Sequence, residues 1–183
     1  LVKKTALEAY SRPRRDGIIG INIREGDSLL EAALTDGESN IILANKKGRA
    51  IRFHEEEVRD MGRNTSGVKG MTLGKENEVV DMVVIKNTHE ATVLAISENG
   101  YGKRSFVDDY SEQSRGGKGV ITLKVTPKTG NLISLKEVSD KDDLMVITER
   151  GKIIRMQCSG IRTMGRNTQG VRIMRLDEQG KIA

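Results

Sequence analysis

The sequence predicts an all-β, propeller-like protein built from four-stranded blades. Three observations lead to this fold class: a repeat of about 51 residues, apolar residues that alternate or form short runs, and frequent glycine. The 183 residues include 20 glycines but only two prolines, so glycine, asparagine and aspartate must form most turns. We therefore expect one repeat domain over residues 1–183.

Two sets of matching residues define the repeat. The segment Met-Gly-Arg-Asn-Thr-Ser-Gly-Val at residues 61–68 returns at 164–171 with a single change, and a related segment lies between them at 113–120. The glycines that close such segments are spaced by 50, 52 and 51 residues, at Gly17, Gly67, Gly119 and Gly170. Apolar runs that lead into Gly48, Gly100 and Gly151 form the second set. The expected blades are approximately residues 1–48, 49–100, 101–151 and 152–183, the last one shortened.

Each repeat is expected to hold four strands, because its apolar pattern has a period of two or forms short runs. In the second repeat these strands fall near residues 50–53, 67–73, 79–85 and 91–96, and in the third near 101–105, 119–125, 131–137 and 144–148. A short helical turn is expected near residues 55–61. Blades of this kind bury their faces only against neighbouring blades.

Charge is segregated along the chain. The net charge is only +5, but acids gather at residues 55–57 and 140–143, whereas residues 162–175 hold four arginines and no acid. Another basic group lies near the N-terminus and includes Lys3, Lys4, Arg12, Arg14 and Arg15. This distribution favours a polyanionic partner, and the acidic runs are expected to form solvated loops.

Several classes of protein are excluded by what the chain contains. The longest apolar run, residues 79–85, includes Asp81 and is too short to span a bilayer. The single Cys158 cannot form an internal disulfide, which fits a reducing compartment. Gly62 and Gly67 have the spacing of a phosphate-binding loop, but Val68 stands where that loop needs lysine. The only two histidines, at positions 54 and 89, are isolated, so we expect no catalytic residue, no metal site and no cofactor in this chain.

Three segments carry a resemblance to a known family. They are Gly-Tyr-Gly-Lys-Arg-Ser at residues 100–105, the repeated Met-Gly-Arg-Asn-Thr-x-Gly-Val segment, and Leu-Met-Val-Ile-Thr at residues 144–148. Together they resemble the C-terminal domain of bacterial DNA gyrase A, over the whole chain. The related DNA-binding domain of topoisomerase IV is the nearest relative and stays open as an alternative. The resemblance implies a β-pinwheel, a disc of usually six blades that exchange outer strands, with duplex DNA wrapped around its basic rim.

The resemblance also implies a role within a larger enzyme. The chain would be a non-catalytic module of an ATP-dependent type II topoisomerase that introduces negative supercoils. Its partners would be duplex DNA, the rest of the gyrase A protein and the gyrase B protein, in the bacterial cytoplasm at the nucleoid. No membrane partner is expected.

The sequence departs from the family pattern at one motif. The family's first blade carries the box Gln-(Arg/Lys)-Arg-Gly-Gly-(Arg/Lys)-Gly, whose nearest match here is residues 113–119, with Ser114 where a cation is expected. Because this match lies in the third repeat, we expect these repeats to be the later four blades and the box to lie outside the chain. Such a chain is expected to bind DNA but to wrap it poorly.

One cationic loop per repeat would supply the rim, because duplex DNA carries one negative charge per about 1.7 Å of its axis. Arg63, Arg115 and Arg166 occupy matching loop positions, and a second set of cations lies four residues after the repeat glycines or in the matching slot of the first repeat. The expected DNA-binding residues are Lys4, Arg12, Arg14, Arg15, Lys47, Arg52, Arg63, Asn64, Lys69, Lys103, Arg104, Arg115, Lys118, Arg155, Arg166, Asn167 and Arg172.

Three alternatives stay open at this point. The loops would be simple turns with solvated arginines, or the strand cations would face a neighbouring blade instead of DNA. The whole chain would alternatively be a protein-binding propeller, although its aromatic content of 3% disfavours the apolar face that such a propeller needs.

Overall fold

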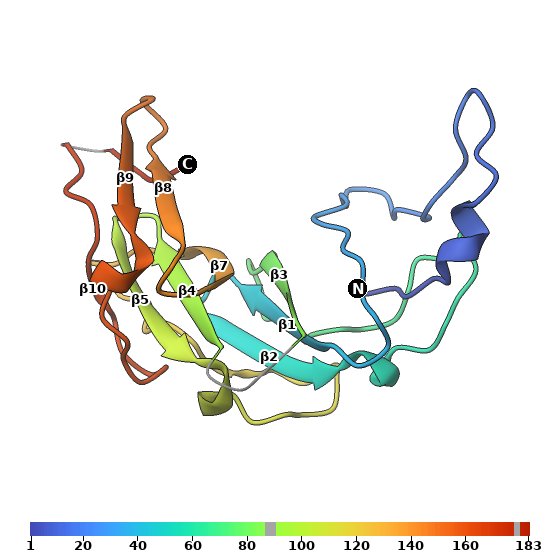
Figure 1. Ribbon diagram of the computed structural model, residues 1–183, viewed down its shortest axis with the longest axis horizontal. Helices are drawn as coiled ribbons and strands as arrows, with labels where there is room; N and C mark the ends of the chain where they lie inside the picture. Colours follow the sequence, from blue (N-terminus) through green and yellow to red (C-terminus); the bar gives the residue numbers. More distant parts are fainter. Residues whose placement is uncertain (87–90, 178–179) are drawn as a thin grey trace.

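The computed structural model describes residues 1–86, 91–177 and 180–183, so His89 lies outside the described residues. It confirms the all-β class: antiparallel sheets follow one another along an open arc (Figure 1). The strands are β1 (Asn40–Asn45), β2 (Arg49–His54), β3 (Val79–Ile85), β4 (Thr92–Ser97), β5 (Tyr101–Phe106), β6 (Val120–Ile121), β7 (Leu132–Val138), β8 (Asp143–Ile147), β9 (Ile153–Gln157) and β10 (Val171–Arg172). Within the described residues, no helix has the length and apolar character needed to cross a membrane.

Each complete sheet borrows its last strand from the repeat that follows. The first sheet has the order β3-β1-β2-β6 and the second has the order β7-β4-β5-β10, whereas β8 and β9 form a two-stranded sheet. The borrowed strands β6 and β10 lie at the edge away from β3 and β7, and β10 lies on the outer side of the arc in Figure 1. This exchange is the arrangement expected of a β-pinwheel.

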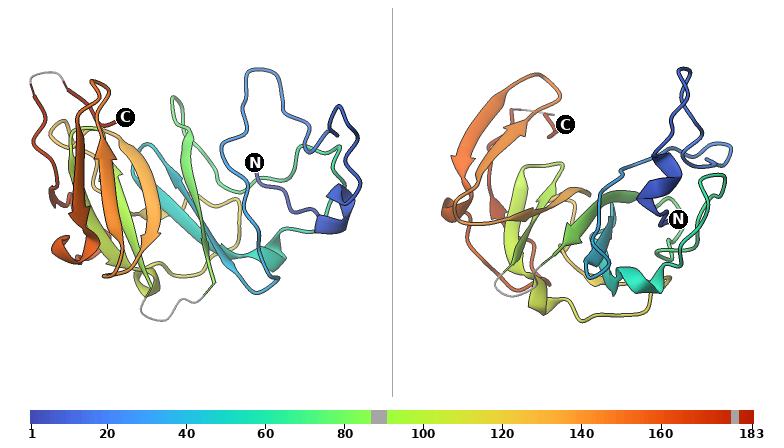
Figure 2. Two further views of the ribbon diagram at one scale, coloured as in Figure 1. Left: turned by 45° about the horizontal axis from the view of Figure 1, so that its top comes forward. Right: turned by 45° about the vertical axis from the view of Figure 1, so that its right-hand side comes forward.

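The apolar core lies between successive sheets, which appear as successive layers in Figure 2. Ile42 and Ala44 of β1 face Val93 and Ala95 of β4 in one fully buried cluster. The opposite face of the β1–β2 hairpin packs on the first repeat through Val2 and Val68, and β4 packs on β8 in a third cluster. Alternate residues of each strand therefore face opposite neighbours, which explains why the strands read as continuous apolar runs.

The strands expected near residues 50–53, 79–85, 91–96, 101–105, 131–137 and 144–148 are confirmed as β2, β3, β4, β5, β7 and β8. The segments expected at residues 67–73 and 119–125 are much shorter: the first forms only a bridge between Val2 and Val68, and the second forms the two-residue β6. Pairing stops after Ile121 because the amides of Thr122 and Leu123 both donate to the carbonyl of Gly48. A bend at the outer edge thus ends the strand.

A short 3₁₀ turn follows the second strand of each hairpin. The helical turn expected over residues 55–61 is present only at Glu55–Glu57, and it recurs at Val107–Asp109 and Cys158–Gly160. A related turn covers Leu7–Tyr10. The expectation of a solvated acidic loop is wrong for Glu55, which is 3% exposed and accepts hydrogen bonds from Thr35 Oγ1 and from the amides of Gly37 and Ser39.

The sheets divide the chain differently from the expected units 1–48, 49–100, 101–151 and 152–183. Those boundaries fall in the turns of three hairpins, β1–β2, β4–β5 and β8–β9, whose two strands pair along all or nearly all of their length. We therefore propose structural units that begin at β1, β4 and β8, because a hairpin is the part of each sheet that one repeat supplies complete.

Candidate nucleic-acid interface

Three rim segments form the outer edge of the arc: residues 62–69, 113–121 and 165–172. The second contains β6 beside β2, the third contains β10 beside β5, and the first bridges to Val2. The second and third segments are therefore at the outer edges of their sheets, and the exposed asparagine and lysine side chains of the segments lie outside the core. Eight of the expected DNA-binding residues belong to the rim segments, namely Arg63, Asn64, Lys69, Arg115, Lys118, Arg166, Asn167 and Arg172. A ninth, Lys103, lies on β5, and its amine contacts the third segment.

The loop arginines share one anchorage. Arg115 donates from Nε to the carbonyl of Glu57 at 2.7 Å and from Nη1 to that of Lys69 at 3.1 Å. Arg166 repeats this geometry on the carbonyls of Asp109 and Ile121, at 3.0 and 3.1 Å. Arg63 donates to the carbonyl of Ile19 at 2.6 Å. In each case the acceptor belongs to the preceding repeat.

This anchorage fixes the guanidinium without cancelling its charge. The acceptors in these bonds are neutral carbonyls, and no ion pair joins Arg63, Arg115 or Arg166 to an acid within the described residues. Two N–H groups of Arg115 are used in the bonds described, and an arginine has further donors in the same plane. A positioned, uncompensated guanidinium is suited to bind phosphate.

The closing glycines are required by the neighbouring strand. Gly67, Gly119 and Gly170 have φ values of 93, 68 and 75°, and a Cβ atom on them would lie 2.3, 2.3 and 2.5 Å from the carbonyl oxygens of the strand beside them. Their lack of a side chain therefore lets the outer segment approach the preceding repeat.

Asn64 and Asn167 are exposed at the tips of the two matching loops. The next residues stabilise the turns, since Thr65 and Thr168 donate to the carbonyls of Gly62 and Gly165 at 2.9 and 3.1 Å. The threonines are thus used inside the loop, while the asparagine side chains are presented outward. Lys47, Lys69 and Lys118 are exposed as well.

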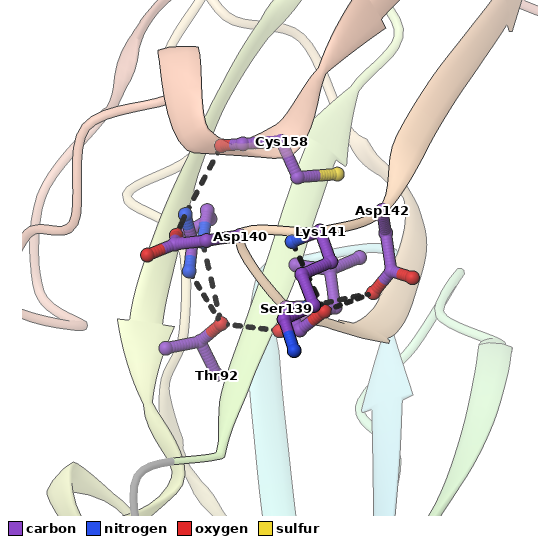
Figure 3. A network of polar contacts seen from close by, with 8 residues as sticks. Thr92, Ser139, Asp140, Lys141, Asp142 and Cys158 are labelled. Atoms are coloured by element: carbon purple, nitrogen blue, oxygen red, sulfur yellow. Dashed lines mark hydrogen bonds and ion pairs between the residues drawn. The ribbon is translucent and has the colours of Figure 1, made fainter.

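The strand cations have partners inside the molecule. Arg104 is 6% exposed and donates to Asp140 Oδ1 at 2.6 Å, to the carbonyl of Cys158 at 3.0 Å and to Thr92 Oγ1. Figure 3 shows Thr92, Asp140 and Cys158 grouped at this junction. Arg52 donates to the carbonyls of Val107 and Tyr110. Both arginines thereby reach the 3₁₀ turn of the next repeat.

Lys4 and Arg155 are the first and last of the strand cations, and of these two only Lys4 binds the next repeat within the described residues. Lys4 donates to the carbonyl of Glu55 at 3.2 Å and forms an ion pair with Asp60 at 3.8 Å. Arg155 instead forms an ion pair with Asp143, which lies on β8 of the same hairpin. The geometry gives Lys4, Arg52 and Arg104 a role in joining repeats, and the contact of all four cations with DNA stays a prediction.

Lys103 is a fully buried cation. Its amine donates to the carbonyls of Gly165 and Arg166 and to Ser105 Oγ, so it holds the loop that carries Arg166. Burial lowers the pKa of Lys103 to about 8, an effect that Asp109 opposes and Arg166 reinforces. Lys103 supports the rim from beneath and does not reach its surface.

Lys3 is a site residue that sequence reasoning missed. Its amine donates to the carbonyls of Gly20 and Arg63, as Lys103 does for Arg166. Lys3 occupies the position in its repeat that Lys103 occupies in β5, and this match is the signal that could have identified it. In the intervening repeat Ile51 takes this position, and there the loop has the different sequence Gln-Ser-Arg-Gly-Gly.

The basic group of the first repeat is separate from the rim segments. Arg12, Arg14 and Arg15 are exposed in the stretch after the Leu7–Tyr10 turn, and within the described residues their side chains have no hydrogen bond or ion pair. The residues that the structure describes also contain no group of three or more His, Cys, Asp or Glu side chains placed to hold a metal.

Comparison with known proteins identifies the family. The family described as "DNA gyrase C-terminal domain, beta-propeller" matches residues 1–36, 39–86, 91–139 and 142–183. The chain belongs to this family. The DNA gyrase A protein of Salmonella typhimurium is 41% identical over 181 residues, and that of Deinococcus deserti is 42% identical over 185 residues. These matches span 99% and 100% of the chain but only 20% and 23% of the relatives.

Solved structures of gyrase and topoisomerase IV C-terminal domains have the same fold. The C-terminal domain of DNA topoisomerase IV superimposes with a TM-score of 0.92 at 26% identity, over 100% of this chain and 57% of that one. A DNA gyrase A C-terminal domain superimposes with a TM-score of 0.81 at 29% identity, over 92% and 57%. The resemblance stated from the sequence and the β-pinwheel fold are thereby confirmed.

Proposed function

We propose that the chain binds duplex DNA along its rim segments without sequence specificity, as the C-terminal module of a type IIA topoisomerase. The observation that carries this proposal is the shared anchorage of Arg63, Arg115 and Arg166, one per repeat, on neutral carbonyls at the outermost strand. Repeated cations at regular spacing suit a regular polyanion. Among the described residues, no helix of a length suited to the major groove is present, which fits binding through the backbone.

In the whole enzyme this binding would wrap DNA around the rim and support ATP-driven negative supercoiling. The partners would be the rest of the gyrase A protein and the gyrase B protein, in the bacterial cytoplasm at the nucleoid. Family membership supports this role. The proposal assigns no catalytic role to any residue of this chain.

The test is the affinity for a mixed-sequence duplex as a function of salt. Each of Arg63→Ala, Arg115→Ala and Arg166→Ala should weaken binding by roughly 0.5–1.5 kcal/mol and reduce the salt slope by about 0.9. Because the contacts lie in different repeats, double variants should be near additive. Equal affinity for unrelated sequences at one salt concentration is expected as well.

The controls separate charge from folding. Alanine also removes bonds to the preceding repeat, so the melting temperature is measured for each variant and the matching Arg→Lys variant, which keeps the charge, is included. Lys141→Gln removes one exposed cation outside the rim segments and should leave affinity unchanged. Unaltered binding by the Arg115→Ala/Arg166→Ala double variant would contradict the rim assignment. Nicked-circle ligation then measures whether bound DNA is wrapped.

A further inference from the structure

A cluster of cations surrounds Tyr101 at the outer end of the second sheet. Lys128 Nζ lies 5.3 Å and Arg172 Cζ 5.5 Å from the centre of the Tyr101 ring. Arg172 Nη2 also donates to Tyr101 Oη at 2.9 Å. A pocket of about 280 Å³ opens here, and its lining includes Lys128, Arg172 and Arg175 but no carboxylate among the described residues.

The matching position of the first sheet has different residues and different contacts. Arg49 on β2 pairs with Ile121 on β6 in the register that joins Tyr101 on β5 to Arg172 on β10. The Arg49 guanidinium is used by the carbonyls of Lys118 and Gly119, at 3.2 and 2.6 Å. In the second sheet the cation of this pair is Arg172 on the outermost strand β10, and its partner on β5 is the aromatic Tyr101.

The partners of Arg172 orient it without neutralising it. A ring face and a phenol oxygen attract a guanidinium, but neither carries a formal charge. Lys128 approaches the same ring, so two like charges share one neutral platform. Their mutual repulsion in a partly buried site is relieved when an anion binds between them.

We propose that Tyr101, Lys128 and Arg172 form a phosphate-binding site for the backbone of duplex DNA. Arginine offers a planar pair of donors to phosphate oxygens and lysine adds a mobile positive charge. Arg172 lies on the third rim segment, six residues beyond Arg166, so the proposed site shares that segment with the Arg166 loop. This inference rests on the proposed function for the identity of its ligand.

The phenol of Tyr101 reports on the site. Its hydrogen bond from Arg172 lowers the pKa of Tyr101, burial opposes this effect, and the charges of Arg172 and Lys128 reinforce it. Arg175 is the third charged residue of the pocket lining among the described residues. An anion held by these cations weakens their effect on the phenolate, so binding of phosphate should raise the pKa of Tyr101.

Affinity measurements on a mixed-sequence duplex test the site. Lys128→Gln and Arg172→Gln should each weaken binding about 3- to 10-fold and reduce the salt slope by about 0.9. Tyr101→Phe keeps both charges, so it should leave the salt slope unchanged and weaken binding about 2- to 3-fold through loss of the hydrogen bond that orients Arg172. Lys141→Gln is the matched loss of an exposed charge elsewhere and should change affinity less than twofold.

A second readout uses protein labelled with ¹³C at tyrosine Cζ, of which the chain has three, titrated with and without inorganic phosphate. The resonance that disappears in Tyr101→Phe is that of Tyr101, and it should titrate with a pKa below the ordinary value of tyrosine. Added phosphate should raise this pKa. Arg172→Gln should abolish both the lowered pKa and its response to phosphate.

The outcomes distinguish this site from the proposed function. If Arg115→Ala weakens DNA binding while Lys128→Gln and Arg172→Gln behave like Lys141→Gln, the Tyr101 site is wrong and the rim proposal stands. If the wild-type chain binds no duplex but phosphate still raises the pKa of Tyr101, the site binds phosphate and the DNA function is wrong. A Tyr101 resonance that phosphate leaves unchanged, with normal affinity in all three variants, overturns the site outright.

Discussion

The β4–β5 hairpin and the β8–β9 hairpin have the same strand register but different surroundings. Leu94 pairs with Arg104 in the first, and Met145 pairs with Arg155 in the second. Leu94 is 1% exposed because it packs in the cluster that includes Val146 of β8, whereas Met145 is 59% exposed. Within the described residues, no further sheet covers the Met145 face. A repeat therefore supplies an apolar face, and the following repeat decides whether it becomes core.

The hairpin glycines should show the largest difference between the two regions. Gly48, Gly100 and Gly151 have φ values of 78, 80 and 78°, so alanine at any of them incurs a left-handed strain of roughly 1–2 kcal/mol. A Cβ atom would also lie 2.2 Å from the carbonyl oxygen of Leu123 at Gly48 and 2.5 Å from that of Met174 at Gly100, but it meets nothing within 4 Å at Gly151.

Gly48→Ala and Gly100→Ala are therefore expected to lower the free energy of unfolding by roughly 2 kcal/mol or more beyond the loss in Gly151→Ala. Urea denaturation of the three variants measures the difference. Equal losses at all three positions would mean that the borrowed strands do not approach the hairpin turns as closely as described.

The strand arginines should give the next largest difference. Arg104 is 6% exposed and is bound by Asp140, Thr92 and the carbonyl of Cys158, so Arg104→Met should cost about 2–3 kcal/mol through lost charge-assisted hydrogen bonds. The Arg155 side chain is 72% exposed and binds only Asp143 in the described structure, so Arg155→Met should cost less than about 1 kcal/mol.

Thermal denaturation of both variants in parallel provides the measurement, with Arg104→Lys to show whether a charge alone suffices. A loss at Arg155 as large as that at Arg104 would contradict the role of the next repeat in binding the strand cation.

The third expected difference is a pH dependence of stability that originates in the second sheet. Lys103 pairs with Ala95, and Ile154 takes its place in the β8–β9 hairpin. Burial lowers the pKa of Lys103 to about 8, whereas the unfolded chain has an ordinary lysine pKa of about 10.4. Between about pH 8 and pH 10 the unfolded state thus binds more protons, so the free energy of unfolding should rise with pH in this window.

Lys103→Met removes this contribution, and its stability should gain less between pH 7.5 and pH 10 than that of the wild type. Lys141→Met, an exposed lysine, is the control and should follow the wild type. Parallel curves for all three proteins would show that Lys103 titrates normally in the folded state.

Much of the fold was predictable from local pattern. The strands at residues 79–85 and 101–106 were placed almost to the residue, because apolar runs between glycine turns have few other conformations open to them. The outer segments were predicted too long, since Val68 pairs only with Val2 and β6 covers only two residues. Their partners lie in the preceding repeat, and pairing at such a distance leaves little local signal.

The candidate site was predictable only in part. The matching positions of Arg63, Arg115 and Arg166 follow from the repeat alone. The burial of Lys103 and the contacts of Arg104 with the next repeat could not be predicted. The sequence does not show whether a cation in a strand faces solvent or the next repeat. The cluster of Lys128 and Arg172 joins residues of different repeats around one ring, so no single segment reveals it.

The sequence by itself determined the repeat, the all-β class, the turn glycines and the spacing of the loop arginines, because these depend on periodicity and on backbone conformations close along the chain. Only the tertiary structure decided which cations stay free and which join one repeat to the next. The physical reason is the exchange of outer strands: each rim segment finds its partners about one repeat away, and so do the strand cations Arg52 and Arg104. Whether a charge there is solvated or satisfied depends on the backbone carbonyls that a neighbouring repeat brings to it.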